Sequence, residues 1–131
     1  MRLLLDTHIA LWAILGDGRL PKLAKGLIED FDNDVFVSAA SVWEITVKHA
    51  LARGRPNDMP ISAPEALTYF RRAGYGLLAV NAEHAAAVSD LPQHHSDPFD
   101  RVLVAQAQIE PLRLITRDAR LAGYGSMVQV V

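Results

Sequence analysis

Five short, mainly apolar segments constrain the fold of this chain more than any other feature. They cover residues 2–5, 35–37, 76–80, 112–116 and 127–130. A strand with one face in water alternates polar and apolar residues, whereas a strand covered on both faces is almost continuously apolar. Because segments with helical spacing separate these runs, we expect a parallel sheet whose strands are joined by right-handed helical crossovers.

The predicted helices lie between the strands and carry clear start and stop signals. Asp97-Pro98 is the strongest start signal, and Ser62 precedes Pro64 and Glu65 in the pattern of a capping box. We expect helices over residues 9–15, 21–31, 39–53, 63–73, 82–89 and 97–109, and a helical turn over 119–123. The fold class predicted is α/β, a three-layer α/β/α sandwich around a mainly parallel sheet. The length of 131 residues predicts a single domain covering residues 1–131.

Composition excludes several classes of protein. Half of the residues are hydrophobic and 21% are charged, which argues against disorder. There is no cysteine, so disulfides, thiolate nucleophiles and cysteine zinc sites are absent, and we expect a cytoplasmic protein. The longest apolar run, residues 9–15, is far shorter than a membrane span and is not part of a signal peptide, so we expect no membrane association.

Acidic residues occur where the carboxyl ends of the strands would meet. Asp6 follows the first strand and Asp118 follows the fourth. Asp97 and Asp100 lie in the opening turn of one helix, three residues apart, and Glu44 lies two turns into a largely apolar helix. Ligand sites of open α/β sheets lie beyond this edge, so all five acids are expected to converge there.

A cluster of carboxylates points to a divalent cation. Crowded like charges repel one another, and desolvation increases the penalty. Mg²⁺ binds through a few carboxylates and retains several waters. Two such ions, about 4 Å apart, activate a water and stabilise the leaving oxygen of a phosphodiester. We therefore expect one or two Mg²⁺ ions, with Mn²⁺ as an alternative.

Each acid also has a structural interpretation. Asp6 and Asp97 are candidate helix N-caps, with capping the main role of Asp97, and Asp118 can open a turn. Glu44 can pair with Lys48 one helical turn later. Taken singly the acids are structural, but their common position at strand ends favours a metal site.

At this point the residues resemble a known family. Leu3-Leu-Leu-Asp-Thr-His8, Ser38-x-x-Ser-x-Trp-Glu-Ile45, His95-x-Asp-Pro-Phe-Asp-Arg101 and Leu114-Ile-Thr-Arg-Asp118 are similar, in order and type, to the motifs of PIN-domain proteins, specifically toxins of the VapC type. The resemblance covers nearly the whole chain. It implies a PIN-like fold and the toxin of a type II toxin–antitoxin system, a Mg²⁺- or Mn²⁺-dependent endoribonuclease. It also implies a homodimer with an RNA substrate and a cognate antitoxin.

The resemblance also implies roles for individual residues. Asp6, Glu44, Asp100 and Asp118 match the four acidic positions that are catalytic and bind metal, and Asp97 is an additional acid of the motif. Supporting roles in orienting water or substrate, or in capping, fall to Thr7, Ser38 and Thr116. Arg101 and Lys48 are expected to contact phosphate or balance the acids. His94 and His95 form a pair that can bind metal or titrate near neutrality; we interpret them as solvated loop residues. We interpret Trp12 and Trp43 as core or subunit contacts.

The formal net charge of −2 does not contradict an RNA substrate. If the five acids are set apart as a metal pocket, thirteen basic residues face ten acids on the remaining surface. A mildly positive rim of this kind can guide RNA while cations neutralise the centre.

Two other functions are weighed against the nuclease. A phosphatase of the haloacid dehalogenase type needs Asp-x-Asp after the first strand, and here the second position is His8. A catalytically degenerate PIN-like domain, retained for regulation or binding, should have lost one of the acids, whereas all four positions are filled. Metal-dependent cleavage of RNA but not of a phosphomonoester distinguishes the three.

Overall fold

The computed structural model describes residues 1–131, which form a five-stranded sheet with helices on both faces. The strands are β1 (Arg2–Leu5), β2 (Asp34–Ser38), β3 (Gly76–Leu78), β4 (Arg113–Thr116) and β5 (Val128–Val130). They lie in the order β3-β2-β1-β4-β5, and every pairing is parallel. The predicted three-layer α/β/α class with a parallel sheet is confirmed.

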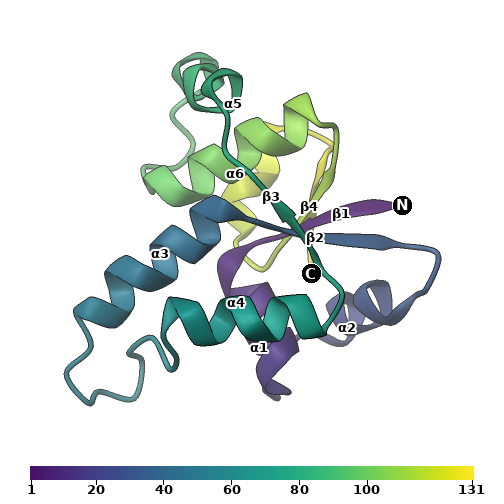
Figure 1. The fold of residues 1–131 in the computed structure, drawn as a ribbon. Coiled ribbons are helices and arrows are strands. Elements are labelled where there is room, and N and C mark those ends of the chain that lie inside the picture. Colours follow the sequence, from purple (N-terminus) through teal and green to yellow (C-terminus); the bar gives the residue numbers. More distant parts are fainter.

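The helices are α1 (Thr7–Leu15), α2 (Lys22–Glu29), α3 (Ala39–Ala50), α4 (Ala63–Arg72), α5 (Ala82–Ala87) and α6 (Pro98–Ile109). Two short 3₁₀ helices, η1 (Val88–Asp90) and η2 (Ala119–Tyr124), complete the secondary structure. In Figure 1, α5 and α6 lie above the sheet and α1, α2 and α4 lie below it. None of these helices is both long and apolar enough to cross a membrane.

The central strand divides the core into two layers. Leu3 and Leu5 are fully buried against α1, α3 and α4, in a cluster that includes Ile45 and Phe70. Leu4 points to the opposite face, where it packs with Leu103 and the other apolar residues of α6 and η2. Alternate side chains of one strand therefore enter different layers, which explains why β1 is apolar throughout.

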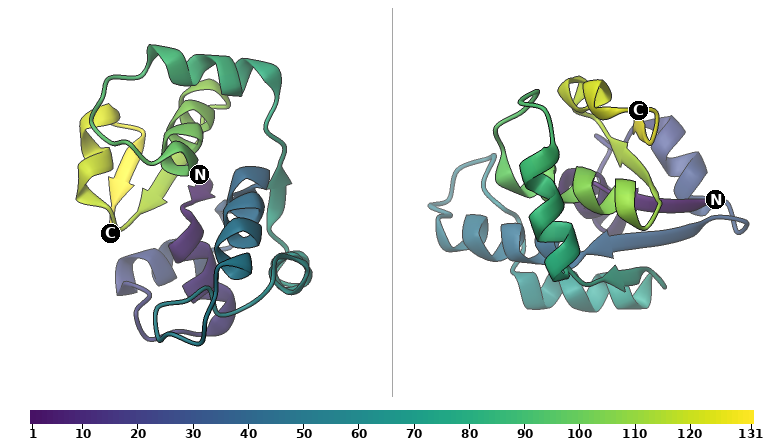
Figure 2. Two further views of the ribbon diagram at one scale, coloured as in Figure 1. Left: turned by 90° about the vertical axis from the view of Figure 1, so that its left-hand side faces the viewer. Right: turned by 90° about the horizontal axis from the view of Figure 1, so that it is seen from above.

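The topology brings distant segments to one edge of the sheet. β1 lies between β2 and β4, with Leu5 opposite both Val37 and Ile115. The carboxyl ends of these three strands therefore lie side by side, and α1 and α3 leave from this edge at once (Figure 2). Residues after β1, β2 and β4 are neighbours for this reason.

Several helix boundaries differ from the predictions. α3 ends at Ala50 rather than near Arg53. Its last turn is tightened by a hydrogen bond from the Leu51 N–H to the Lys48 carbonyl, and the next segment folds around a carboxylate instead. Asp58 Oδ2 accepts hydrogen bonds from the N–H groups of Arg53 and Arg55, both at 2.7 Å. The predicted helix over residues 82–89 is divided into α5 and η1, and α2 ends at Glu29 rather than at residue 31.

Candidate active site

Helix capping positions three of the predicted acids. Asp6 Oδ1 accepts from the His8 N–H at 3.0 Å at the start of α1, and Asp97 Oδ1 accepts from the Phe99 N–H at 2.9 Å at the start of α6. Asp118 Oδ1 accepts from the Arg120 N–H at 3.0 Å and caps η2. The capping predicted for Asp6 and Asp97 is thus confirmed. In all three residues the capping hydrogen bond is accepted by Oδ1, so Oδ2 of each carboxylate is not used for capping.

Asp6 and Glu44 form what we call the buried pair, with residue exposures of 8% and 2%. Thr116 Oγ1 donates to Asp6 Oδ2 at 2.6 Å, and Thr7 Oγ1 donates to Glu44 Oε1 at 2.6 Å. The second oxygen of Glu44 forms an ion pair with Lys48 Nζ at 2.5 Å. Burial raises the pKa of the Asp6 carboxyl, while the hydrogen bonds from Thr116 and His8 oppose that rise.

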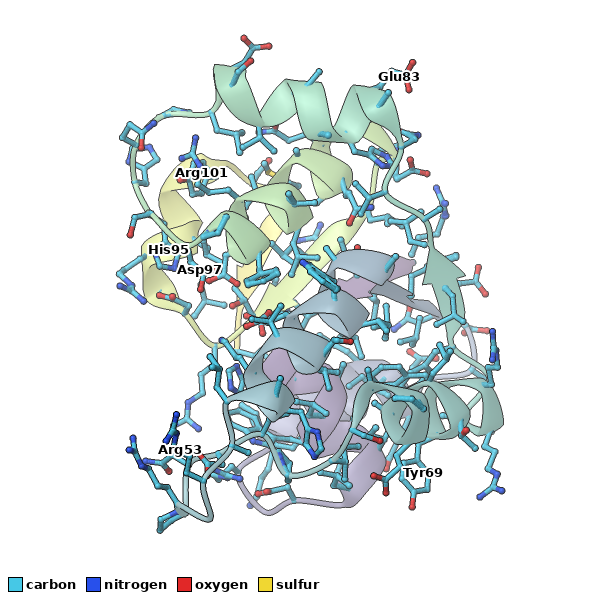
Figure 3. All side chains as sticks on the ribbon, turned by 60° about the vertical axis from the view of Figure 1, so that its left-hand side comes forward. Arg53, Tyr69, Glu83, His95, Asp97 and Arg101 are labelled. Atoms are coloured by element: carbon cyan, nitrogen blue, oxygen red, sulfur yellow. The ribbon has the colours of Figure 1, made fainter.

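Asp100 and Asp118 form the outer pair, whose side chains are 15% and 23% exposed. His95 Nε2 lies between them, 2.9 Å from Asp100 Oδ2 and 3.2 Å from Asp118 Oδ2. Arg120 also holds Asp118, through Nε at 3.0 Å and Nη2 at 2.8 Å. Figure 3 shows His95 and Asp97 close together at the start of α6.

The carboxylates influence one another strongly. Desolvation, followed by the negative charges of Asp6, Asp97 and Glu44, raises the pKa of Asp100 to about 7. The Asp118 carboxyl shows the opposite shift, because its hydrogen bonds to Arg120 hold its pKa below the usual value. The two pairs therefore share one electrostatic field, and negative charge is in excess around Asp100.

Lys48 supplies one cation to this centre. Burial lowers its pKa, but the hydrogen bond and charge of Glu44, together with the charges of Asp97 and Asp100, raise it above the ordinary value overall. The prediction that Lys48 balances the acids matches this contact.

His95 corrects one interpretation of the sequence. It is not a solvated loop residue, because its side chain is 7% exposed and bridges two carboxylates. Its Nδ1 accepts from the Ser96 N–H at 3.1 Å, so Nε2 carries the proton and donates to the outer pair. Only its place in the motif, five residues before Asp100, could have indicated this contact. His94 is exposed and lies edge-on to the Tyr124 ring at 5.0 Å.

Arg101 does not reach the carboxylates. Its Nη1 donates to the Pro92 carbonyl at 3.0 Å and to the Tyr124 hydroxyl at 3.1 Å, and its Nη2 donates to the Val88 carbonyl at 3.2 Å. Adjacent residues on a helix do not share a face, so Arg101 points away from the side occupied by Asp100. The expected supporting role for Arg101 is therefore replaced by a structural one, in which it ties the segment before α6 to that helix.

The other supporting residues fall into two groups. Thr7 and Thr116 donate directly to the buried pair, whereas Ser38 caps α3 by accepting from the Ala40 N–H at 3.0 Å. Sequence reasoning gave no role to Ser41. Its hydroxyl lies 2.8 Å from Thr7 Oγ1, the same oxygen that donates to Glu44. Its position three residues before Glu44, on the same face of α3, is the signal that could have identified it.

The donor set fits a hard divalent cation. The carboxylate oxygens of Asp100 and Asp118 lie within 4.8 Å of each other and of the His95 ring nitrogen that bridges them. Asp6, Glu44 and Asp97 do not join this group, but their negative charges act on Asp100. Carboxylate oxygens are the ligands that Mg²⁺ and Mn²⁺ favour. Burial first, and then the charges of Asp6, Asp97 and Glu44, raise the pKa of Asp100, and a cation bound beside it would offset both effects.

Comparison with protein families gives one match. The family model described as the PIN domain matches residues 3–126, a span that includes both pairs and His95. No curated protein matches the sequence.

Solved structures with the same fold come from toxin–antitoxin complexes. VapBC2 from Rickettsia felis, bound to a DNA fragment from its promoter, matches with a TM-score of 0.67 at 14% identity, covering 100% of this chain and 98% of that one. A toxin–antitoxin complex from Klebsiella pneumoniae matches with a TM-score of 0.66 at 23% identity, covering 98% and 96%. VapBC-5 from Mycobacterium tuberculosis matches with a TM-score of 0.62 at 20% identity, covering 99% and 97%.

Proposed function

This chain belongs to the PIN-domain family, and on that premise we propose that it is the toxin of a type II toxin–antitoxin system and cleaves RNA with Mg²⁺ or Mn²⁺. The proposal treats residues 1–131 as a single PIN-like domain. The observation that carries it is the convergence of carboxylates at one sheet edge: Asp100 and Asp118 both contact His95 Nε2, at 2.9 and 3.2 Å, and burial, followed by the charges of Asp6, Asp97 and Glu44, raises the pKa of Asp100 to about 7. A nuclease that recruits cations to a phosphodiester needs such a centre.

The proposed reaction is hydrolysis of the bond between phosphorus and the O3′ atom. Water adds to phosphorus in line with the leaving O3′, which takes up a proton, so the products carry a 5′-phosphate and a 3′-hydroxyl. Mg²⁺ or Mn²⁺, held by Asp6, Glu44, Asp100 and Asp118, would supply Lewis-acid activation of water and neutralise the phosphate charge. Asp97, at the start of α6, is proposed as an additional acid beside this set.

The remaining groups hold these carboxylates in place. Thr116 and Thr7 fix one oxygen of Asp6 and one of Glu44, each at 2.6 Å. Lys48 forms an ion pair with the buried Glu44 side chain and fixes one of its oxygens. His95 donates between the members of the outer pair and reduces their repulsion. The site is thus built before substrate arrives, which is the arrangement that electrostatic catalysis requires.

The proposed partners are an antitoxin and a second copy of the chain. The structural neighbours include toxin–antitoxin complexes from R. felis and K. pneumoniae, which supports an antitoxin partner. Large apolar side chains remain exposed and would be covered by partners; Leu23, Phe31, Trp43 and Leu51 are the most exposed on the helices and loops. Trp43 is 61% exposed, so its interpretation as a core residue is wrong, while the subunit contact stays proposed. Sedimentation at micromolar concentration should give a homodimer, and a strictly monomeric profile would contradict it.

The test is cleavage of a labelled RNA by purified protein in Mg²⁺ or Mn²⁺, with EDTA and a phosphomonoester substrate as parallel reactions. Asp6→Asn and Asp100→Asn should each abolish cleavage while preserving the circular dichroism spectrum. Glu83→Gln is a matched control, because it removes one carboxylate at the far side of the molecule (Figure 3). Full activity in EDTA would contradict the metal mechanism, and a folded wild-type protein without RNA cleavage would favour a degenerate binding domain.

A further inference from the structure

A cavity of about 560 Å³ lies beside the acidic centre, between α1, the end of α3 and the loop that follows α3. Its lining includes His8, Trp12, Arg19, Lys48 and Arg55. Its volume lies in the range of pockets that hold small molecules or single nucleotides, roughly 300–1,000 Å³. None of the motifs discussed above accounts for this cavity.

Two residues connect the cavity with the buried pair. The backbone N–H of His8 donates to Asp6 Oδ1 at 3.0 Å, and the side chain of Lys48 pairs with Glu44 Oε2 at 2.5 Å. His8 and Lys48 both line the cavity, whereas Asp6 and Glu44 do not. A ligand in the cavity would therefore contact residues that are themselves bonded to the buried pair.

The wall of the cavity combines an aromatic ring with guanidinium groups. The guanidinium carbon of Arg19, which lines the cavity, lies 5.4 Å from the centre of the Trp12 ring, and that of Arg117, outside the lining, lies 5.8 Å from it. The His8 ring centre is 5.9 Å from the Trp12 ring centre. Aromatic rings and guanidinium planes are the surfaces on which the bases of single-stranded nucleic acids stack.

The charges of the lining favour an anionic ligand. Arg19, Lys48 and Arg55 are positive, and Asp58 is the one acid in the lining. Asp58 is already engaged, because its Oδ2 accepts from two backbone N–H groups of the loop at 2.7 Å. Arg19 pairs with Asp17 and Lys48 pairs with Glu44, whereas the guanidinium of Arg55 has no carboxylate partner. Arg55 is therefore the cation available to a phosphate.

We propose that this cavity binds one nucleotide of an RNA strand next to the scissile phosphate, with its base against Trp12 and a flanking phosphate at Arg55. The inference rests on the proposed function and assigns to it a substrate-binding subsite. Stacking of one base contributes about 1–3 kcal/mol to binding, so loss of the ring should weaken RNA binding about tenfold or more.

The first test uses the fluorescence of Trp12. The chain has two tryptophans, so Trp43→Phe leaves Trp12 as the sole reporter without touching the cavity. A short single-stranded RNA should quench this variant in EDTA, which removes the metal that the proposed cleavage requires. The complementary Trp12→Phe variant, in which Trp43 is the reporter, should show little quenching. Quenching confined to Trp43 would overturn the proposal.

The second test compares two arginines of the same loop. Arg55→Ala removes a cavity-lining charge, whereas Arg53→Ala removes an equal charge outside the lining, at the periphery of the molecule (Figure 3). Arg55→Ala and Trp12→Ala should raise KM for RNA about tenfold with kcat little changed. Arg53→Ala should leave both constants at the wild-type values. Mg²⁺ binding, measured by calorimetry, should be the same in all variants, because none of these side chains is a proposed metal ligand.

The outcomes separate the subsite from the activity. Wild-type cleavage combined with unchanged KM in Arg55→Ala and Trp12→Ala would overturn the subsite and leave the nuclease intact. Absence of cleavage by the wild type would contradict the proposed function, whatever the fluorescence shows. Quenching of Trp12 by a purified antitoxin but not by RNA would assign the cavity to a protein partner and overturn the RNA proposal.

Discussion

The buried pair and the outer pair lie in one electrostatic field but are held in opposite ways. Asp6 and Glu44 accept from the hydroxyls of Thr116 and Thr7, and each of these bonds joins segments far apart in the chain. Asp100 is held by His95, five residues before it, and Asp118 by Arg120, two residues after it, and His95 also reaches Asp118 from a separate surface segment. The difference indicates that the contacts of the buried pair hold the fold together. The contacts of the outer pair, in contrast, can be replaced by contacts to a ligand.

The largest expected difference between the pairs is in stability. Glu44→Ala should lower the free energy of unfolding by about 3 kcal/mol, because it leaves Lys48 and the Thr7 hydroxyl without their buried partner. Asp118→Ala should cost about 1 kcal/mol, the usual effect of losing a helix cap. Urea unfolding of both variants in EDTA measures this contrast. Equal losses would mean that the two pairs contribute equally to the framework.

The second prediction concerns pH in the metal-free protein. Asp100 has a pKa of about 7 in the folded chain, above its ordinary value of 3.8. Because folding raises this pKa, the folded state binds the proton more tightly, and stability falls as the pH rises from about 4 to 7. Asp100→Asn removes that loss, so its melting temperature in EDTA should exceed that of the wild type by a few degrees at pH 8.

The same comparison at pH 4 supplies the control. There the Asp100 carboxyl is protonated in the folded chain and about half protonated in the unfolded chain, so little of the loss has occurred and the melting temperatures of the two proteins should nearly coincide. Comparing the two proteins at one pH cancels the titration of groups that both contain. A gap as large at pH 4 as at pH 8 would show that Asp100→Asn acts by packing rather than by charge.

The third prediction concerns the bridge across the outer pair. His95→Ala removes the donor between Asp100 and Asp118 and should destabilise the metal-free protein by about 1 kcal/mol. In millimolar Mg²⁺ the difference from wild type should shrink, because a bound cation neutralises the same carboxylates and stabilises both proteins by mass action. Thermal unfolding with and without Mg²⁺ measures the effect. A difference that grows in Mg²⁺ would instead identify His95 as a metal ligand. His94→Ala, one residue earlier and exposed, is the matched control.

The smallest expected effect is at Arg120. This side chain is exposed, and exposed ion pairs contribute roughly 0–1 kcal/mol. Arg120→Ala should therefore leave the melting temperature almost unchanged. It should, however, return the pKa of Asp118 toward its usual value, because the Arg120 hydrogen bonds are the main cause of its decrease. Titration of Asp118 by carboxyl NMR detects this shift. An unchanged pKa would show that His95 alone sets the charge of Asp118.

The sheet and most of the site could be predicted because helix-cap signals in the sequence lie directly after strands, and a parallel sheet brings those strand ends together. Asp6 and Asp97 could be identified as caps from their place before a helix, and a parallel sheet brings strand ends to one edge. The Glu44–Lys48 pair follows from helical spacing, and the structure contains it.

The predictions are wrong for side chains whose contacts are made with a segment distant in the sequence. His95 precedes α6, and no local pattern shows that its ring turns toward Asp118 across the sheet edge. The sequence leads us to expect that Arg101 contacts phosphate or balances the acids, although the helix directs it to the carbonyls that precede α6. Such contacts are set by tertiary packing, which sequence periodicity does not encode.

The central position of β1 has a consequence for the order in which the centre forms during synthesis. The N-terminal half of the chain carries Asp6 and Glu44, but β4 and Asp118 emerge from the ribosome more than a hundred residues after β1. β1 cannot pair along its second edge until β4 has emerged. A nascent chain that ends before β4 therefore holds an incomplete set of carboxylates. If the chain is a toxin, its acidic centre is assembled only after β4 has paired with β1, and an inhibitor of the assembled centre has no complete target before that point.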